Sequence, residues 1–211
     1  MAVLNGTFDL NGKNETMGRV VIGDVSTTGT LTGACILTVA PTYGIFATNT
    51  SAGASSIEAR NGSVDVVLAG NGIALNKTTA GTVTLNQINT YTGKTTVSAG
   101  TLSLAHPCLA DTADVEITTA GDGGFINLAH GVTDVVNALI VDGLPVAGGT
   151  YGGAGSGATH IVSYLTGPGK LQVGSGYDSW ASANGISGEP ATGDFDHDGI
   201  SNLMEYALAG L

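Results

Sequence analysis

Charged residues are scarce in this 211-residue chain: 11% are Asp, Glu, Lys or Arg, and only six are Lys or Arg. Basic side chains attract phosphate groups, so their scarcity argues against nucleic acid and anionic lipid as partners. No apolar run reaches the roughly 18 residues that a membrane-spanning helix needs. The first residues also lack the basic and apolar regions of a signal peptide. We therefore expect a secreted protein whose signal peptide is not in this sequence.

Cysteine, proline and tryptophan are rare as well, with two, five and one residues. Cys35 and Cys108 lie far apart in the sequence, with no CxxC pair and no histidine at a metal-ligand spacing. We expect two buried thiols, and a disulfide is the alternative. The few prolines, without a glycine at every third position, exclude collagen, and the 42% hydrophobic content excludes a disordered chain.

Glycine is abundant, with 34 residues, and many glycines open the same short phrase. In this phrase a glycine and a small polar residue precede two apolar residues separated by a polar one. Alternation with a period of two predicts strands with one buried face. A strand phrase that returns about every 20 residues is typical of a solenoid. The copies are GTFDL at 6, GTLTG at 29, GSVDV at 62, GTVTL at 81, GTLSL at 100 and GKLQV at 169.

No apolar spacing of three and four residues persists through residues 1–173, so helices are not expected there. A β-sandwich would show strands every 8 to 12 residues and would not repeat one phrase. The pattern therefore favours an all-β, parallel β-solenoid. At about 20 residues per rung and about 4.8 Å between rungs, it predicts eight or nine rungs and a rod of about 40 Å.

Residues 83–105, VTLNQINTYTGKTTVSAGTLSLA, resemble the autotransporter-associated β-strand repeat, and residues 4–23 resemble a degenerate copy. Lys94 is a departure, since the family usually has glycine there. The resemblance implies a large exported bacterial surface protein whose passenger region is a right-handed parallel β-helix. The matching residues are Asn89, Thr90, Tyr91, Thr92, Gly93, Thr95, Thr96, Val97, Gly100, Thr101 and Leu102.

Acidic residues concentrate near the C-terminus, where residues 194–205, DFDHDGISNLME, fit the calcium-loop pattern D-x-[DN]-x-[DN]-G-x5-E. Calcium takes six to eight oxygen ligands, which alternate residues of a tight loop can direct to one point. Gly199 at position 6 permits the sharp bend. The predicted Ca²⁺ ligands are Asp194, Asp196, Asp198, the backbone carbonyl of Ile200, Asn202 directly or through water, and Glu205 with two oxygens.

Ser201 occupies the loop position where paired EF-hands place an apolar residue, and the chain has only one such loop. The segment instead resembles the single calcium loops of dockerins and thrombospondin type 3 repeats. Helical patterns flank it at 177–185, which contains Trp180, and at 202–210. We expect a small α-helical calcium-binding module over residues 174–211, with a Kd of about 0.1–1 mM.

No nucleophile, phosphate-loop or HExxH motif occurs, so we expect no enzyme. The alternative is a polysaccharide lyase or hydrolase, or a carbohydrate-binding passenger, because β-helical enzymes assemble sites from carboxylates on adjacent rungs. The acids that a solenoid could bring together are Asp111, Asp114, Glu116, Asp122, Asp134 and Asp142.

Residues 1–173 are thus expected to form the solenoid and residues 174–211 the calcium module. The predicted function is structural or adhesive, outside the cell or at a bacterial surface. The expected partners are further copies of the chain, stacked end to end into filaments, or other surface proteins and glycans. A fragment of a longer passenger is the alternative to a filament subunit.

Overall fold

The structure is a computed structural model. It describes residues 2–17, 20–24, 26–39, 56–174, 186, 190 and 192–209. The predicted helix at 177–185, with Trp180, therefore lies outside the described residues.

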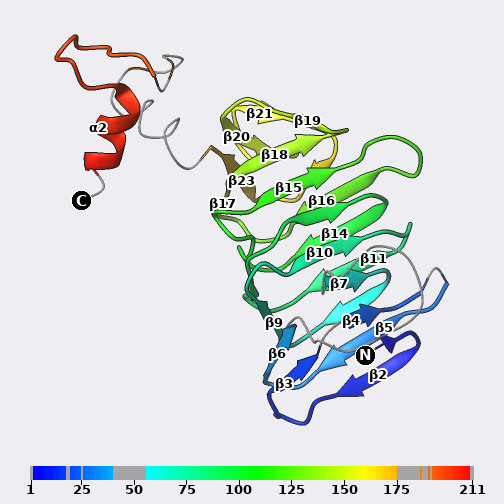
Figure 1. Cartoon of the computed structure of the whole chain (residues 1–211). Helices are drawn as coiled ribbons and strands as arrows, with labels where there is room; N and C mark the ends of the chain where they lie inside the picture. Colours follow the sequence, from blue (N-terminus) through cyan, green and yellow to red (C-terminus); the bar gives the residue numbers. More distant parts are fainter. Residues whose placement is uncertain are drawn as a thin grey trace.

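The described strands form four sheets, A to D, and one described helix follows them (Figure 1). Sheet A contains, in order across the sheet, β1 (Ala2–Val3), β4 (Val20–Ile22), β7 (Ser56–Ala59), β10 (Ala74–Lys77), β13 (Thr95–Val97), β15 (Asp114–Ile117), β18 (Ala138–Val141) and β19 (Leu144–Pro145). Sheet B contains β2 (Gly6–Asp9), β5 (Gly29–Thr32), β8 (Gly62–Val64), β11 (Thr82–Leu85), β14 (Gly100–Leu104), β16 (Gly124–Leu128) and β22 (Leu165–Thr166).

The two smaller sheets have four strands each. Sheet C contains β12 (Thr90–Tyr91), β9 (Val67–Gly70), β6 (Ile36–Val39) and β3 (Glu15–Met17). Sheet D contains β17 (Thr133–Val136), β23 (Lys170–Val173), β20 (Gly149–Gly152) and β21 (His160–Ile161). The helix is α2 (Asn202–Ala209).

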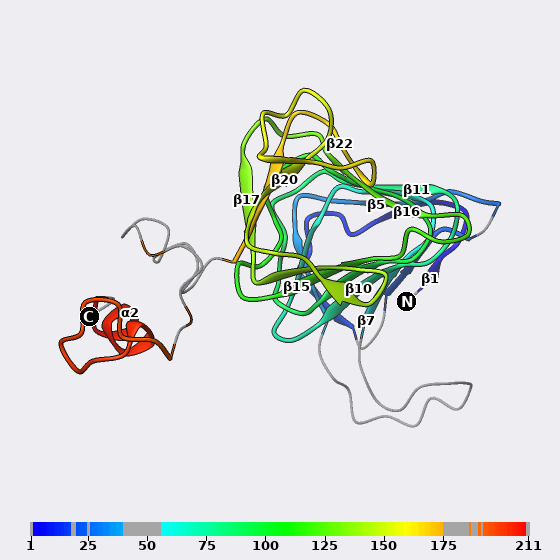
Figure 2. The ribbon, with the colours of Figure 1, turned by 90° about the horizontal axis from the view of Figure 1, so that it is seen from above.

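In sheets B and C, and in sheet A apart from the β18–β19 pair, neighbouring strands come from successive turns of the chain (Figures 1 and 2). The chain adds a strand to sheet A, then one to sheet B and, in the early turns, one to sheet C before it returns to sheet A. Seen end-on, the strands surround one common interior (Figure 2). This nearly all-β, parallel arrangement is compatible with the predicted solenoid. We call each turn a rung and residues 2–173 the coil.

Inward-facing apolar side chains stack in register from one rung to the next. Leu31 pairs with Val64, Val64 with Leu85 and Leu85 with Leu104. Leu104 in turn pairs with Leu128. All five residues are fully buried. The alternation in the recurring phrase therefore arises because every second residue of a sheet B strand joins this column.

The register departs from the spacing of the phrase at one step. Two copies of the phrase begin at Gly62 and Gly81, so the phrase predicts that these two glycines lie side by side on adjacent strands. In the structure, Gly62 pairs with Val83 instead. The next step follows the phrase, because Val83 pairs with Leu102 and thus preserves the 19-residue offset. Among the described residues, sheet B has seven strands and sheet A has eight, and the sequence predicts eight or nine rungs. The rungs are unequal in length, since Leu31 and Val64 are 33 residues apart.

At some of the glycines that open sheet B strands, the backbones of adjacent rungs approach too closely for a side chain, although Gly6 has open space around it. Gly62 has φ +137°, and a Cβ added to it would lie 1.7 Å from the carbonyl oxygen of Gly29. Gly29 pairs with Gly62 in the register. No side chain fits between the two backbones at this point, so glycine at position 62 has a packing cause.

The last strands of the coil break the parallel pattern. β19 pairs antiparallel with β18, and β20 pairs antiparallel with β23. Every other pairing among the described strands is parallel. Asp142 and Gly143 both have positive φ, 50° and 80°, in the turn between β18 and β19. Such a turn suits a two-residue hairpin.

Lys77 occupies an interior position of sheet A that its neighbours fill with Ala59 and Val97. The residue is fully buried. Its Nζ donates hydrogen bonds to the carbonyl oxygens of Thr79 and Ala99, in the turns of two adjacent rungs. Burial lowers the pKa of Lys77 from 10.5 to about 8, because a charged amine is poorly solvated in the interior.

This lowered pKa predicts a pH-dependent stability. The unfolded chain binds the Lys77 proton more tightly, so the burial cost is full below pH 8 and is relieved as the pH rises toward 10.5. The contribution of Lys77 to the free energy of unfolding should rise by about 2 kcal/mol between pH 7 and pH 10. Urea unfolding of wild type and Lys77→Met at both pH values measures it. Equal pH dependence in the two proteins would contradict the prediction.

Candidate functional site

The predicted calcium loop, residues 194–205, leads into α2 (Asn202–Ala209) and ends in the first turn of this helix. The carbonyl oxygen of Ser201 accepts hydrogen bonds from the backbone N–H groups of Met204 and Glu205, at 2.8 and 3.0 Å. Ser201 is therefore the N-terminal cap of the helix. His197 and Gly199 have φ values of 64° and 93°, and these bends turn the loop back on itself. The helix predicted at 202–210 is thus present as α2.

The loop gathers three carboxylates. One oxygen each from Asp194, Asp196 and Asp198 lie within 4.8 Å of one another. Asp194 Oδ2 accepts the N–H of Gly199 at 3.0 Å, and Asp198 Oδ1 accepts the N–H of Ile200 at 2.8 Å. Asp194 Oδ1 is buried and has no hydrogen-bond partner among the described residues. A buried carboxylate oxygen without a partner carries a desolvation cost that a bound cation would offset.

Glu205, at loop position 12, lies near this group. Desolvation is the largest cause that raises the pKa of Glu205, and the negative charges of the three aspartates raise it further. The loop therefore concentrates negative charge at one point. A divalent cation would relieve this repulsion, and its preferred ligands are carboxylate oxygens. The carboxylate oxygens that lie within 4.8 Å of one another are those of Asp194, Asp196 and Asp198, so Glu205 as a ligand remains a prediction.

Asn202 has a role that the loop pattern did not predict. Its side chain is fully buried. Oδ1 accepts the N–H of Phe195 at 3.0 Å, and Nδ2 donates to the carbonyl of Pro190 at 3.1 Å. A direct bond to a metal ion would have to share Oδ1 with Phe195. Ile200 is 38% exposed, and its carbonyl as a ligand remains a prediction, as does Asn202.

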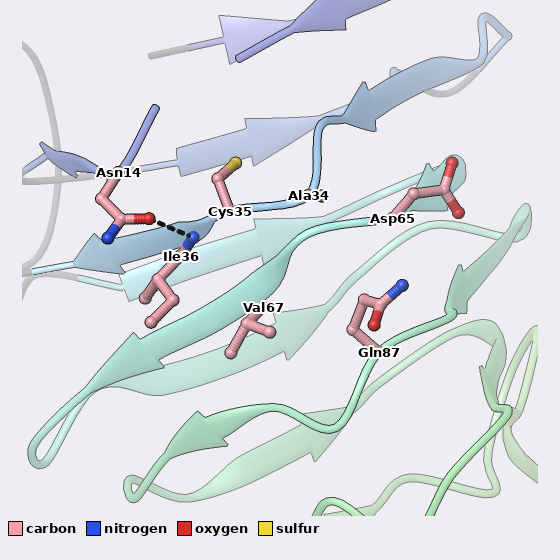
Figure 3. Close-up of a pocket in the computed structure, with 7 residues that line it drawn as sticks. All are labelled: Asn14, Ala34, Cys35, Ile36, Asp65, Val67 and Gln87. Atoms are coloured by element: carbon pink, nitrogen blue, oxygen red, sulfur yellow. Dashed lines mark hydrogen bonds between the residues drawn. The ribbon is translucent and has the colours of Figure 1, made fainter. Parts of the chain in front are cut away.

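A groove on the coil is a second candidate site, and no sequence motif marks it. It encloses about 450 Å³ and crosses four rungs (Figure 3). Residues from widely separated parts of the sequence meet in it because successive rungs stack. The lining residues are Asn14, Ala34, Cys35, Ile36, Asp65, Val67 and Gln87.

Four of the acids considered for catalysis form bonds between different segments of the coil. Asp134 Oδ2 accepts the N–H groups of Cys108 and Leu109 at 2.9 and 3.2 Å, and desolvation by burial raises the pKa of Asp134. The other contacts join Asp114 to Asn137, Asp142 to Thr119 and Glu116 to Lys94. Hydrogen bonds from Thr119 lower the pKa of Asp142. These contacts give the acids a structural role.

Both cysteines are buried and free, as the sequence analysis expected. Desolvation by burial raises the pKa of each thiol. A raised pKa keeps a thiol protonated and unreactive.

Residues of the predicted repeat make specific contacts between rungs. Asn89 is buried, and its Oδ1 accepts the N–H of Leu68 on the preceding rung at 2.8 Å. The hydroxyl groups of Tyr91 and Thr95 lie 3.0 Å apart in the interior. Asn89, Tyr91 and Thr95 are thus fixed by packing inside the coil.

Residues 75–104 match the family model of the passenger-associated-transport-repeat. The match extends from β10 to β14 and supports an autotransporter passenger repeat in this part of the chain. No curated protein and no solved structure gives a significant match. The match does not reach the calcium loop, whose resemblance to dockerin and thrombospondin type 3 loops remains a prediction.

The passenger repeat also bears on where the protein acts. Such a repeat implies a secreted or cell-surface protein, and its description names transport rather than a catalytic activity. Lys94, which departs from the repeat pattern, forms an ion pair with Glu116 of the next rung. Among the helices that the structure describes, none is long and apolar enough to cross a membrane.

Proposed function

We propose that the chain is a structural or adhesive part of a bacterial surface passenger. In this proposal residues 1–173 form a right-handed β-solenoid rod and residues 174–211 a calcium-binding module. The main support for the rod is that buried apolar residues pair in register from each rung to the next. A second support is that acids considered for catalysis bond to neighbouring segments of the coil.

The calcium ion has a structural role in this proposal. Asp194, Asp196, Asp198 and Glu205 would hold it through carboxylate oxygens, and Ile200 and Asn202 remain the other candidates. The support is the buried Asp194 Oδ1, which has no hydrogen-bond partner among the described residues, together with the three aspartate oxygens that lie within 4.8 Å of one another. Binding would neutralise like charges immediately before α2, and so would stabilise the loop that caps this helix.

The partners that fit best are surface proteins or glycans that contact the side of the rod. End-to-end stacking into filaments has less support, because antiparallel strands β19 and β20 lie at the C-terminal end of the coil. Continuing the rod at that end would require a strand to pair parallel with the last rung. Pro145 in β19 further weakens this edge, since proline cannot donate a backbone hydrogen bond.

The structural role predicts a monomeric protein without polysaccharide-degrading activity. Sedimentation velocity of the purified chain, with calcium and with EDTA, should give one species whose size does not depend on concentration. Incubation with neutral and acidic polysaccharides should release no reducing ends. Concentration-dependent growth of the species would favour filaments instead, and released reducing ends would favour a lyase or hydrolase.

A further inference from the structure

The groove on the coil runs across the rungs. Asn14 comes from the first rung, Cys35 and its neighbours from the second, Asp65 and Val67 from the third and Gln87 from the fourth (Figure 3). Three steps of about 4.8 Å separate the first rung from the fourth, so the groove is about 14 Å long. A volume of about 450 Å³ is large enough for a short oligomeric ligand.

The middle of the groove is apolar. Ile36 is 42% exposed although it is a large aliphatic residue, and Val67 is half-buried beside it. Ala34 is exposed and adds a small apolar surface. Exposed aliphatic groups gain free energy when a ligand covers them. A ligand that fits must therefore present C–H groups toward the floor of the groove.

Polar groups border this apolar strip. Asn14 Oδ1 accepts the N–H of Ile36 at 2.9 Å, which directs the amide nitrogen of Asn14 away from that bond. Asp65 Oδ1 accepts a hydrogen bond from Asn86, so Oδ2 is available as an acceptor. Gln87 is exposed and its amide can both donate and accept. The groove thus offers donors and acceptors on either side of an apolar strip.

The charge around the groove restricts the ligand further. Among the described residues that line the groove there is no lysine or arginine, and Asp65 is the one charged side chain. Burial is the main cause that raises the pKa of the Cys35 thiol, and the negative charges of Asp9 and Glu15 raise it further. The carboxylate of Asp65 in the lining, with no cation beside it among the described lining residues, disfavours anionic ligands such as uronates. One carboxylate, already bonded to Asn86, is a poor match for a basic peptide.

We propose that this groove binds a neutral oligosaccharide. Sugar rings would place their C–H faces on Ile36 and Val67, and their hydroxyl groups would bond to Asn14, Asp65 and Gln87. The hydroxyl groups of a neutral sugar both donate and accept, as the mixed border of the groove requires. The proposal deepens the adhesive role and rests on it, because it names the chemical class of the surface partner.

Amide NMR titration of the full chain tests the proposal, with cellohexaose, xylohexaose and maltohexaose as probes and trigalacturonate as the acidic comparison. At least one neutral hexaose should shift the amide signals of residues 34–36, 65–67 and 87 saturably, and trigalacturonate should not. Ala34→Tyr fills the groove and should abolish binding. Gln87→Ala should weaken binding at least fivefold, whereas Gln172→Ala, an amide in β23, should leave it unchanged.

Three outcomes would overturn the proposal: no saturable shift with any neutral hexaose, equal binding by Ala34→Tyr, or stronger binding of trigalacturonate. Sedimentation and the amide spectrum of each variant without ligand are the folding control, and both should match those of the wild-type chain. A failure here leaves the structural rod and the calcium module in place, because sedimentation and calcium titration measure those separately.

Discussion

A Gly62→Ala substitution is expected to lower the free energy of unfolding by about 3–5 kcal/mol. The added Cβ would lie 1.7 Å from the carbonyl oxygen of Gly29, so the two rungs would have to separate at this point. The φ of +137° adds strain, because residues with a Cβ rarely adopt it. Separation would also weaken the hydrogen bonds that pair β5 with β8.

Urea or thermal unfolding followed by far-UV circular dichroism measures this loss. Gly131→Ala is the matched control, because a Cβ there would meet no atom within 4 Å and its φ is not in the positive range. The control should change stability by less than about 0.5 kcal/mol. Equal effects of the two substitutions would show that the close approach of Gly29 and Gly62 does not limit the packing of the rungs.

The second large effect is expected in calcium binding. Isothermal titration of the wild-type chain should show one site with a Kd of about 0.1–1 mM, and Asp196→Ala should abolish it or weaken it more than tenfold. Asp196 is the most suitable of the three aspartates to change, because it is exposed and its Oδ1 accepts only a 3.3 Å hydrogen bond from the N–H of Asp198. Its replacement removes a ligand with little damage to the loop.

Asp122→Ala is the control for the loss of one negative charge, since Asp122 is an exposed acid of the coil. It should leave calcium binding unchanged. An absence of binding by the wild-type chain would contradict the calcium site. Binding that survives Asp196→Ala would show that the ion lies elsewhere than in the acidic loop.

The strands and their parallel stacking could be predicted because the interior column imposes alternation on each rung. Leu85 and Leu104 repeat at 19 residues, and the sequence repeats with them. The pairing of Gly62 with Val83 could not be predicted from the sequence. The turns between strands can gain or lose residues without changing which residues are buried, so the repeat spacing does not determine the register.

The antiparallel end of the coil has a local signal in the sequence that lies outside the repeated phrase. Asp142 and Gly143 stand between two apolar segments, and an Asp-Gly pair in this setting is a strong hairpin signal. The groove had no such signal. Asn14 and Gln87 become neighbours only through the stacking of intervening rungs, so no local pattern could connect them. The hydrogen bond from the Asn202 side chain to the carbonyl of Pro190 likewise had no signal in the sequence, because these residues, 12 positions apart, meet only in the folded chain.

The stacking of rungs also determines how the coil would respond to mechanical force. Hydrogen bonds between neighbouring parallel strands are slanted, but each of them joins one rung to the next, and so they resist separation along the axis on which the rungs stack. Tension on this axis would load the rungs in series, so that one rung opens before the next. Opening at the step between Leu85 and Leu104 would release 19 residues, about 65 Å of extended chain. Such a rod would lengthen in steps under load and keep its remaining rungs folded.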